Sequence, residues 1–249
     1  MSVSEETVDD ENIESGSADL GWMYAAYVNE NHPQLDKILQ EALATKIVDS
    51  FDGYQAHDPT DVVKQVFAIW TALQKHGIQY SSVTETPGGS PLVNSQFIRF
   101  LDQSIAMKQA NCVDGTVLFA SLLRKVGINP ALITHPDHMY LAINLNESGD
   151  EDERELLGLE TTDIGVSEIE QKDSEYPEAL ANLEEELSSS SNVRNSKAWK
   201  SFVAAVLDGE DDLDENEDKF DAGDPNWQII EVSEARAKGI MPISFEASR

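Results

Sequence analysis

The chain contains only one cysteine, Cys112, among its 249 residues, so no disulfide can form within it. Its stability therefore has to come from an apolar core, and its cysteine content does not call for an oxidising compartment. Hydrophobic residues make up 40% of the sequence, which is enough for the core of one large domain.

Basic residues are scarce as well. The sequence has 17 lysines and arginines against 47 aspartates and glutamates, and its formal net charge is −30. Nucleic acids and anionic membranes are bound through clusters of Lys and Arg, and we find no such cluster in the sequence. We therefore expect no nucleic-acid partner and no membrane partner. Solubility explains the acidic excess most simply, and a specific basic partner or divalent cations are the alternative.

Long apolar runs are also missing. No segment approaches the roughly 20 apolar residues that a membrane-spanning helix needs. Residues 1–19 lack the apolar stretch of a signal peptide. From these absences we expect a cytoplasmic protein.

Two acidic stretches have few apolar side chains. Residues 1–18 cannot offset the entropy cost of ordering, so we expect a disordered acidic tail there. We interpret residues 208–224 as an acidic insertion within a single domain of residues 19–249. An EF-hand calcium loop is excluded, because its sixth and twelfth positions, counted from Asp208, are Leu213 and Lys219 instead of Gly and Glu. We expect no metal and no cofactor.

Hydrophobic periodicity predicts an α+β fold with a helical N-terminal part. A helix is expected to start at Asp58-Pro59 and to end near Gly77, and a second helix is expected over residues 112–126. The strand candidates follow one another closely, as in an antiparallel sheet. They lie at residues 131–134, 138–145 and 156–160, and a final strand is expected at residues 227–232.

Three residues in these elements carry groups that can act together in catalysis. Cys112 is expected in the first turn of its helix, where unpaired N–H groups stabilise a thiolate and an oxyanion. His138 begins one strand and Glu160 ends the next, so an imidazole and an orienting carboxylate could both reach the sulfur. The spacing alone leaves open the alternative that Cys112 is an inert, packed core residue.

Residues 111–128 resemble the nucleophile helix of the transglutaminase-like superfamily, with a Cys, an acidic neighbour, an apolar helix and a Leu-Leu-Arg-x-x-Gly-Ile ending. His-Met-Tyr at 138–140 resembles the strand motif His-Ala-Trp, and Gly-Leu-Glu-Thr-Thr at 158–162 resembles the third motif. Residues 69–80 resemble the preceding helix and the strand with its tyrosine. The resemblance covers about residues 60–165. It implies a papain-like core, in which the cysteine helix packs on an antiparallel sheet that carries the His and the acid.

The chain departs from the family pattern at several positions. The acid is Glu160 where Asp is usual, and Asp163 is a competing candidate. Tyr140 stands where Trp is usual, and His135 is a second candidate base.

The side-chain oxyanion donor is open: Gln109 is the first candidate, Gln103 another by residue type, and Asn111 is expected to cap the helix. Asp114 is expected to be a favourable first-turn charge. We predict that three histidines are surface residues without a role: His32, His57 and His76.

The resemblance implies a cysteine-dependent enzyme that transfers acyl groups from amide bonds of a protein or peptide substrate through a thioester. Water as the acceptor would make it a peptidase or amidase, and an amine would make it a transglutaminase. The alternative is a catalytically silent domain of the same fold that serves as an acidic protein-interaction module. The oligomeric state does not follow from the sequence.

Overall fold

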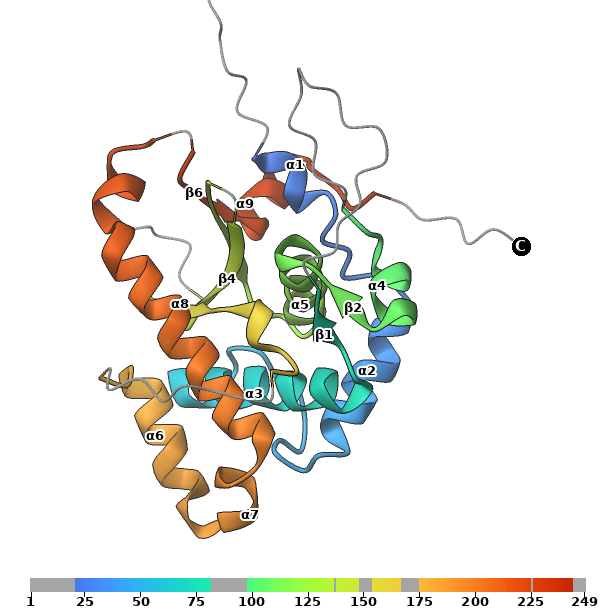
Figure 1. Cartoon of the computed structure of the whole chain (residues 1–249), viewed down its shortest axis with the longest axis vertical. Coiled ribbons are helices and arrows are strands. Elements are labelled where there is room, and N and C mark those ends of the chain that lie inside the picture. Colours follow the sequence, from blue (N-terminus) through green and yellow to red (C-terminus); the bar gives the residue numbers. More distant parts are fainter. Residues whose placement is uncertain are drawn as a thin grey trace, which may run out of the picture.

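A four-stranded antiparallel sheet with the strand order β5-β4-β3-β6 forms the centre of the molecule (Figure 1). The computed structural model describes residues 21–81, 98–136, 138–147, 154–166, 175–224 and 226–243. The tail expected at residues 1–18 lies outside the described residues. The four strands have these bounds: β3 (Pro130–His135), β4 (His138–Asn144), β5 (Leu156–Leu159) and β6 (Gln228–Glu231).

The two faces of the sheet are covered by different helices, because side chains alternate along the strands. Met139, Leu141 and Ile143 belong to the main core, together with the apolar side of α5 (Cys112–Lys125). Tyr140 and Ala142 face the other way, into a smaller cluster that includes residues of α8 (Lys197–Asp221). We expected all four strands from the sequence, and the structure confirms a mixed fold of helices and an antiparallel sheet.

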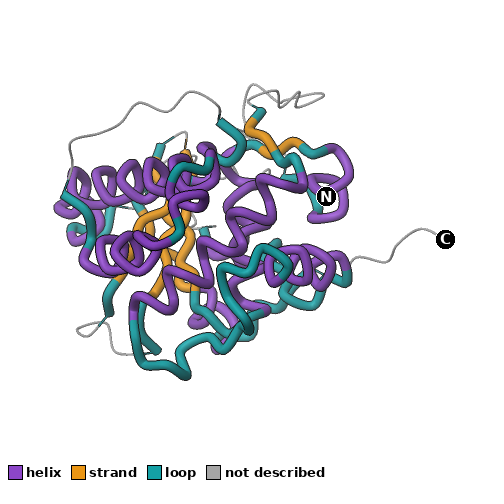
Figure 2. The backbone as a smooth tube through the Cα atoms, turned by 90° about the horizontal axis from the view of Figure 1, so that it is seen from below, coloured by secondary structure: helices purple, strands orange, loops and turns teal. Residues whose placement is uncertain are grey.

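The remaining helices surround these layers (Figure 2). The longest of them is α3 (Pro59–His76), in which Asp58 accepts a hydrogen bond from the N–H of Thr60 (2.8 Å) and Gly77 closes the end at φ 86°. Both ends agree with the prediction from the sequence. The others are α1 (Trp22–Ala25), α2 (Gln34–Leu43), α4 (Leu101–Met107), α6 (Glu178–Glu186), α7 (Ser191–Arg194) and α9 (Val232–Ala237). Within the described ranges, none of the helices combines the length and the apolar character that crossing a bilayer requires.

A small parallel pair of strands leads into the cysteine helix. β1 (Gln79–Tyr80) pairs with β2 (Gln109–Ala110), so that Tyr80 lies beside Ala110. The N–H of Ser81 extends this pairing by donating to the carbonyl of Ala110 at 2.9 Å. The pairing therefore holds the segment that follows α3 close to the start of α5.

The acidic segment 208–224, which we interpreted as an insertion, is mostly helical. It forms the C-terminal half of α8, a helix of 25 residues whose start is capped by Ser196. Leu213 and Phe220 lie on one side of this half and pack against the second face of the sheet. Leu213 and Phe220 anchor one face of this half, while five carboxylates are exposed to solvent: Asp214, Glu215, Glu217, Asp218 and Asp221.

Two glycines allow α8 to lie directly on β5. A Cβ atom on Gly209 would collide with the backbone of Gly158 and Leu159, and one on Gly158 would collide with the backbone of Gly209. The contact is reinforced by hydrogen bonds: Gly158 N–H donates to Glu210 Oε1 (2.5 Å), and Glu160 N–H donates to the carbonyl of Ala205 (2.8 Å). The position of Glu160 therefore depends on how closely the helix approaches the strand.

This contact predicts that replacing Gly209 by alanine destabilises the protein, which is the opposite of the usual effect in a helix. At an exposed helical site Gly→Ala stabilises by about 0.5 to 1 kcal/mol. We expect Gly209→Ala to destabilise instead, by about 1 to 3 kcal/mol, because the added methyl group forces helix and strand apart. Urea denaturation measures the free energy of unfolding, with Glu215→Ala at an exposed position of α8 as the control. A stabilised Gly209→Ala variant would contradict the close approach.

Candidate active site

Cys112 is the first residue of α5, as the sequence predicted. The helix start is held by a reciprocal pair of hydrogen bonds: the N–H of Asp114 donates to Asn111 Oδ1 (2.7 Å), and the N–H of Asn111 donates to Asp114 Oδ2 (3.3 Å). Asn111 is therefore the helix cap that we expected. The amides of the first helical turn have no partner within the helix, so those at Cys112 and Val113 can bind an anion near the sulfur.

Asp114 does more than place a charge in the first turn. Its side chain is fully buried and forms an ion pair with Arg99 Nη1 at 2.6 Å, while the N–H of Arg99 donates to Asp114 Oδ1 at 2.8 Å. A buried carboxylate needs such partners, because desolvation of an unpaired charge is costly. The ion pair therefore ties the segment before α4 to the start of the cysteine helix.

His138 and Glu160 are joined directly. His138 Nε2 lies 2.6 Å from Glu160 Oε2, and both side chains are largely buried. The interaction with Cys112, and after it the one with Glu160, raises the pKa of the His138 imidazole to about 10 against the opposing effect of burial. Since Glu160 occupies Nε2, the other ring nitrogen, Nδ1, is left for Cys112. The structure thus brings together all three residues that the sequence singled out.

Both oxygens of the Glu160 carboxylate have partners. While Oε2 holds His138, Oε1 accepts hydrogen bonds from the N–H of Thr162 (2.8 Å) and from its hydroxyl group (2.7 Å). Glu160 caps the short 3-10 helix η3 (Thr161–Asp163), and the Thr161 hydroxyl lies 3.1 Å from that of Thr116 in α5. These contacts orient the carboxylate toward the imidazole.

The competing candidates occupy other places. Glu160, and not Asp163, contacts His138 Nε2. His135 lies beside His138 in the paired strands, but its Nε2 is 3.5 Å from Asp212 Oδ2 and its ring stacks on Trp227. Tyr140, which stands at the family's Trp position, is buried in the cluster that α8 covers.

The candidate oxyanion donors remain less defined than the triad. Gln109 is exposed on β2, close in sequence to Cys112, and among the described residues no hydrogen bond joins it to the triad. Gln103 accepts a hydrogen bond from the N–H of Phe100 at 3.1 Å and belongs to the start of α4. The backbone amides at the start of α5 are therefore the donors that the geometry favours.

Two tyrosines that we did not single out from the sequence lie near Cys112. Burial raises the pKa of Tyr24 in α1, and the electrostatic influence of Cys112 raises it further. The pKa of Tyr80 in β1 is raised by burial, then by Cys112 and Glu160. Tyr80 belongs to the segment that carried the resemblance, whereas nothing in the sequence pointed to Tyr24.

One of the three remaining histidines does not lie at the surface, where we predicted it. His32 is buried, and this burial lowers its pKa, so our prediction of a surface residue was wrong for it. The sequence could not show this, because the Pro33 that follows looks like a loop signal. His57 is exposed, and His76 lies 3.2 Å from Glu41. Among the described residues, no group of three or more His, Cys, Asp or Glu side chains is placed to hold a metal ion.

The raised pKa of His138 leads to a prediction for its titration. Both Cys112 and Glu160 favour the imidazolium, so removing either one should let the proton leave at lower pH. In NMR pH titrations we expect the wild-type His138 ring to titrate near 10, and to shift toward its ordinary value of 6.5 in Cys112→Ala and, less far, in Glu160→Gln. His138→Asn identifies the signal, and the His57 signal serves as the control. A wild-type value near 6.5 would show that the imidazole does not pair with the sulfur.

No protein-family model, no curated protein and no solved structure matches this chain. The resemblance to the transglutaminase-like superfamily therefore stays a prediction, and the function has to be inferred from the geometry of the site.

Proposed function

We propose that the chain is a cysteine-dependent acyltransferase or hydrolase of amide bonds with a transglutaminase-like, papain-like core. The observation that carries the proposal is the placement of His138: Glu160 holds one ring nitrogen at 2.6 Å, and the interaction with Cys112 is the main cause of its raised pKa. An imidazole between a sulfur and a carboxylate is the arrangement that activates a cysteine nucleophile.

The order of the elements supports the same proposal. The cysteine begins a helix that packs on one face of the antiparallel sheet, the histidine begins the inner strand β4, and the acid follows the neighbouring strand β5. The resemblance in the sequence implies this order of nucleophile, base and acid. A core of this kind leaves the start of the helix next to the end of the sheet, where a substrate amide can approach the sulfur.

In the first step of the mechanism, the proton of the Cys112 thiol moves to His138. The Cys112 thiolate attacks the amide carbonyl carbon, and the carbonyl oxygen becomes an oxyanion that the amides at the start of α5 stabilise. When the C–N bond breaks, His138 gives its proton to the leaving amine, and a thioester remains on Cys112. Water or a second amine then attacks the thioester, with His138 accepting the proton of the incoming group and returning it to the sulfur.

Glu160 acts on His138 and not on the substrate. Its carboxylate stabilises the imidazolium and fixes the direction of the ring, while Thr162 keeps the carboxylate itself in place. The substrate is an amide of a protein or peptide. Water as the acceptor gives hydrolysis, and an amine as the acceptor gives cross-linking.

Reactivity of the single cysteine tests this proposal directly. An ordinary thiol is only a few per cent thiolate at pH 7, whereas a thiol that has given its proton to His138 is largely thiolate. We expect iodoacetamide to label native Cys112 at pH 7 at least about tenfold faster than the same cysteine in the urea-unfolded chain. Intact-mass spectrometry follows the reaction, and any label is assigned unambiguously because the chain has one cysteine.

Matched variants show whether the triad causes this reactivity. His138→Asn should lower the labelling rate about tenfold or more, and Glu160→Gln should lower it less. His57→Asn is the control for the first, because His57 is exposed and its φ of 53° suits Asn. Glu185→Gln at an exposed position of α6 is the control for the second. If His138→Asn labels as fast as wild type, the chain is better described as a silent domain of this fold that serves as an acidic protein-interaction module.

A further inference from the structure

The side chain of Thr116 lies where the three elements that carry the triad meet. Thr116 belongs to α5, about one helical turn after the cysteine, and is fully buried. Its hydroxyl oxygen lies 3.4 Å from the carbonyl oxygen of Met139 in β4 and 3.1 Å from the hydroxyl oxygen of Thr161 in η3. Met139 directly follows His138, and Thr161 directly follows Glu160. One hydroxyl group therefore connects the cysteine helix to the neighbours of the base and of the acid.

The chemistry of these groups fixes the direction of the two hydrogen bonds. A carbonyl oxygen can only accept, so the single hydroxyl proton of Thr116 is donated to Met139. The hydroxyl group of Thr161 then has to donate to the oxygen of Thr116. We call this chain of two hydrogen bonds, from Thr161 through Thr116 to the Met139 carbonyl, the hydroxyl link.

The carbonyl group of Met139 needs this partner because the neighbouring strand has ended. In an antiparallel strand every second residue directs its N–H and C=O groups to the same side. The N–H of Leu145 donates to the carbonyl of Glu155 on the β5 side, so Met139 faces that side as well. The register of β4 with β5 stops at Leu141, two residues short of Met139. Thr116 thus satisfies a carbonyl group that the sheet leaves without a strand partner.

The hydroxyl link has little room to rearrange. Thr116 and Thr161 are both buried, and a β-branched side chain has few rotamers to choose from. The neighbouring Gly115 allows η3 to lie close to α5, because a Cβ atom at this position would come within 3.2 Å of the Thr161 hydroxyl oxygen. The packing therefore holds the two hydroxyl groups at hydrogen-bond distance.

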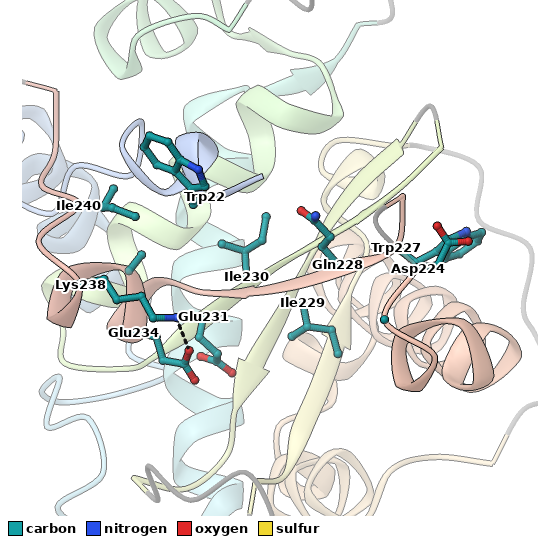
Figure 3. Close-up of a pocket in the computed structure, with 12 residues that line it drawn as sticks. Trp22, Asp224, Trp227, Gln228, Ile229, Ile230, Glu231, Glu234, Lys238 and Ile240 are labelled. Carbon is teal, nitrogen blue, oxygen red and sulfur yellow. Dashed lines mark hydrogen bonds and ion pairs between the residues drawn. The ribbon is translucent and has the colours of Figure 1, made fainter. Parts of the chain in front are cut away.

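At the other edge of the sheet, near β6 and α9, the connections are made by charged groups. The guanidinium group of Arg154 lies 3.2 Å from the carboxylate of Glu231 and 3.5 Å from that of Glu234. Glu234 also lies 3.4 Å from the ammonium group of Lys238 (Figure 3). Charges of this kind beside the His138 imidazole would shift its pKa. Hydroxyl groups connect the elements of the triad without adding a charge there.

We propose that Thr116 is a positioning residue, whose hydroxyl group sets the place of the cysteine helix relative to the imidazole and the carboxylate. It acts through the backbone of Met139 and the side chain of Thr161, and it does not touch the substrate. Without the hydroxyl group, α5 can shift against β4, and the imidazole loses part of its interaction with the sulfur. This inference rests on the proposed function for its effect on Cys112, whereas the hydroxyl link can be measured without any reaction.

Isosteric variants test the effect on the triad. Thr116→Val keeps the shape of the side chain and removes the hydroxyl group, while Thr116→Ser keeps the hydroxyl group. We expect iodoacetamide to label Cys112 at pH 7 at least about fivefold more slowly in Thr116→Val, while Thr116→Ser keeps at least about half of the wild-type rate. In NMR titrations the His138 ring should lose its proton at lower pH in Thr116→Val than in wild type, and Thr116→Ser should restore most of this shift.

Thr71→Val is the matched control. Thr71 is buried in α3, and among the described residues its hydroxyl group has no hydrogen-bond partner. The chemical change is the same as at position 116, but it breaks no connection to the triad, so Thr71→Val should label as fast as wild type. The proposal is overturned if Thr116→Val also labels as fast as wild type, or if Thr116→Ser labels as slowly as Thr116→Val.

A double-mutant cycle tests the hydroxyl link itself. Thr116→Val and Thr161→Val each break the bond between the two hydroxyl groups, so the double variant should lose less stability in urea denaturation than the two single losses added together. Additive losses would overturn the inference whatever the reactivity of Cys112. Coupled losses with slow, ordinary labelling of wild-type Cys112 would contradict the proposed function and leave the link standing. If Thr116→Val does not fold, Thr161→Val and Thr161→Ser take its place in the labelling comparison, because they break and keep the same bond.

Discussion

The close contact between Gly158 of β5 and Gly209 of α8 constrains much of the molecule. Neither residue has a side chain, so a helix of 25 residues lies directly on the backbone of an outer strand of the sheet. The same helix reaches the other layer, where Ser201 accepts a hydrogen bond from the indole N–H of Trp70 in α3 at 2.9 Å. Because Glu160 follows β5 and bonds to the carbonyl of Ala205, the helix that closes the second face of the sheet also sets the position of the acid.

The candidate site places positively charged side chains beside negatively charged groups, in a chain whose formal net charge is −30. The imidazolium of His138 lies between the Glu160 carboxylate and the Cys112 sulfur, and both raise its pKa. The buried pair of Arg99 and Asp114 lies at the start of α5 and keeps it in place. Each of these two cations is therefore paired with an anion close by, which is what burial of charges requires.

Most elements of the fold could be predicted from local patterns. Asp58 and Gly77 bound α3, Asn111 caps α5, and the alternation around Leu141 separates the two faces of the sheet. The acidic half of α8 could not be predicted, because its charge density resembles that of a loop and its anchoring depends on apolar side chains that meet the sheet. A helix whose stability comes from distant packing leaves only a weak local signal.

The sequence by itself determined the types of reactive group, their order along the chain and the elements that carry them, because caps and periodicity are local properties. Only the tertiary structure decided between Glu160 and Asp163 as the acid, and between His138 and His135 as the base. Each pair lies close together in the sequence, so the choice depends on where the two side chains point in the folded protein. The tertiary structure alone also joined α1 to β6 and α9. These features join segments from opposite ends of the chain, and such contacts are set by how the layers pack and not by any local pattern.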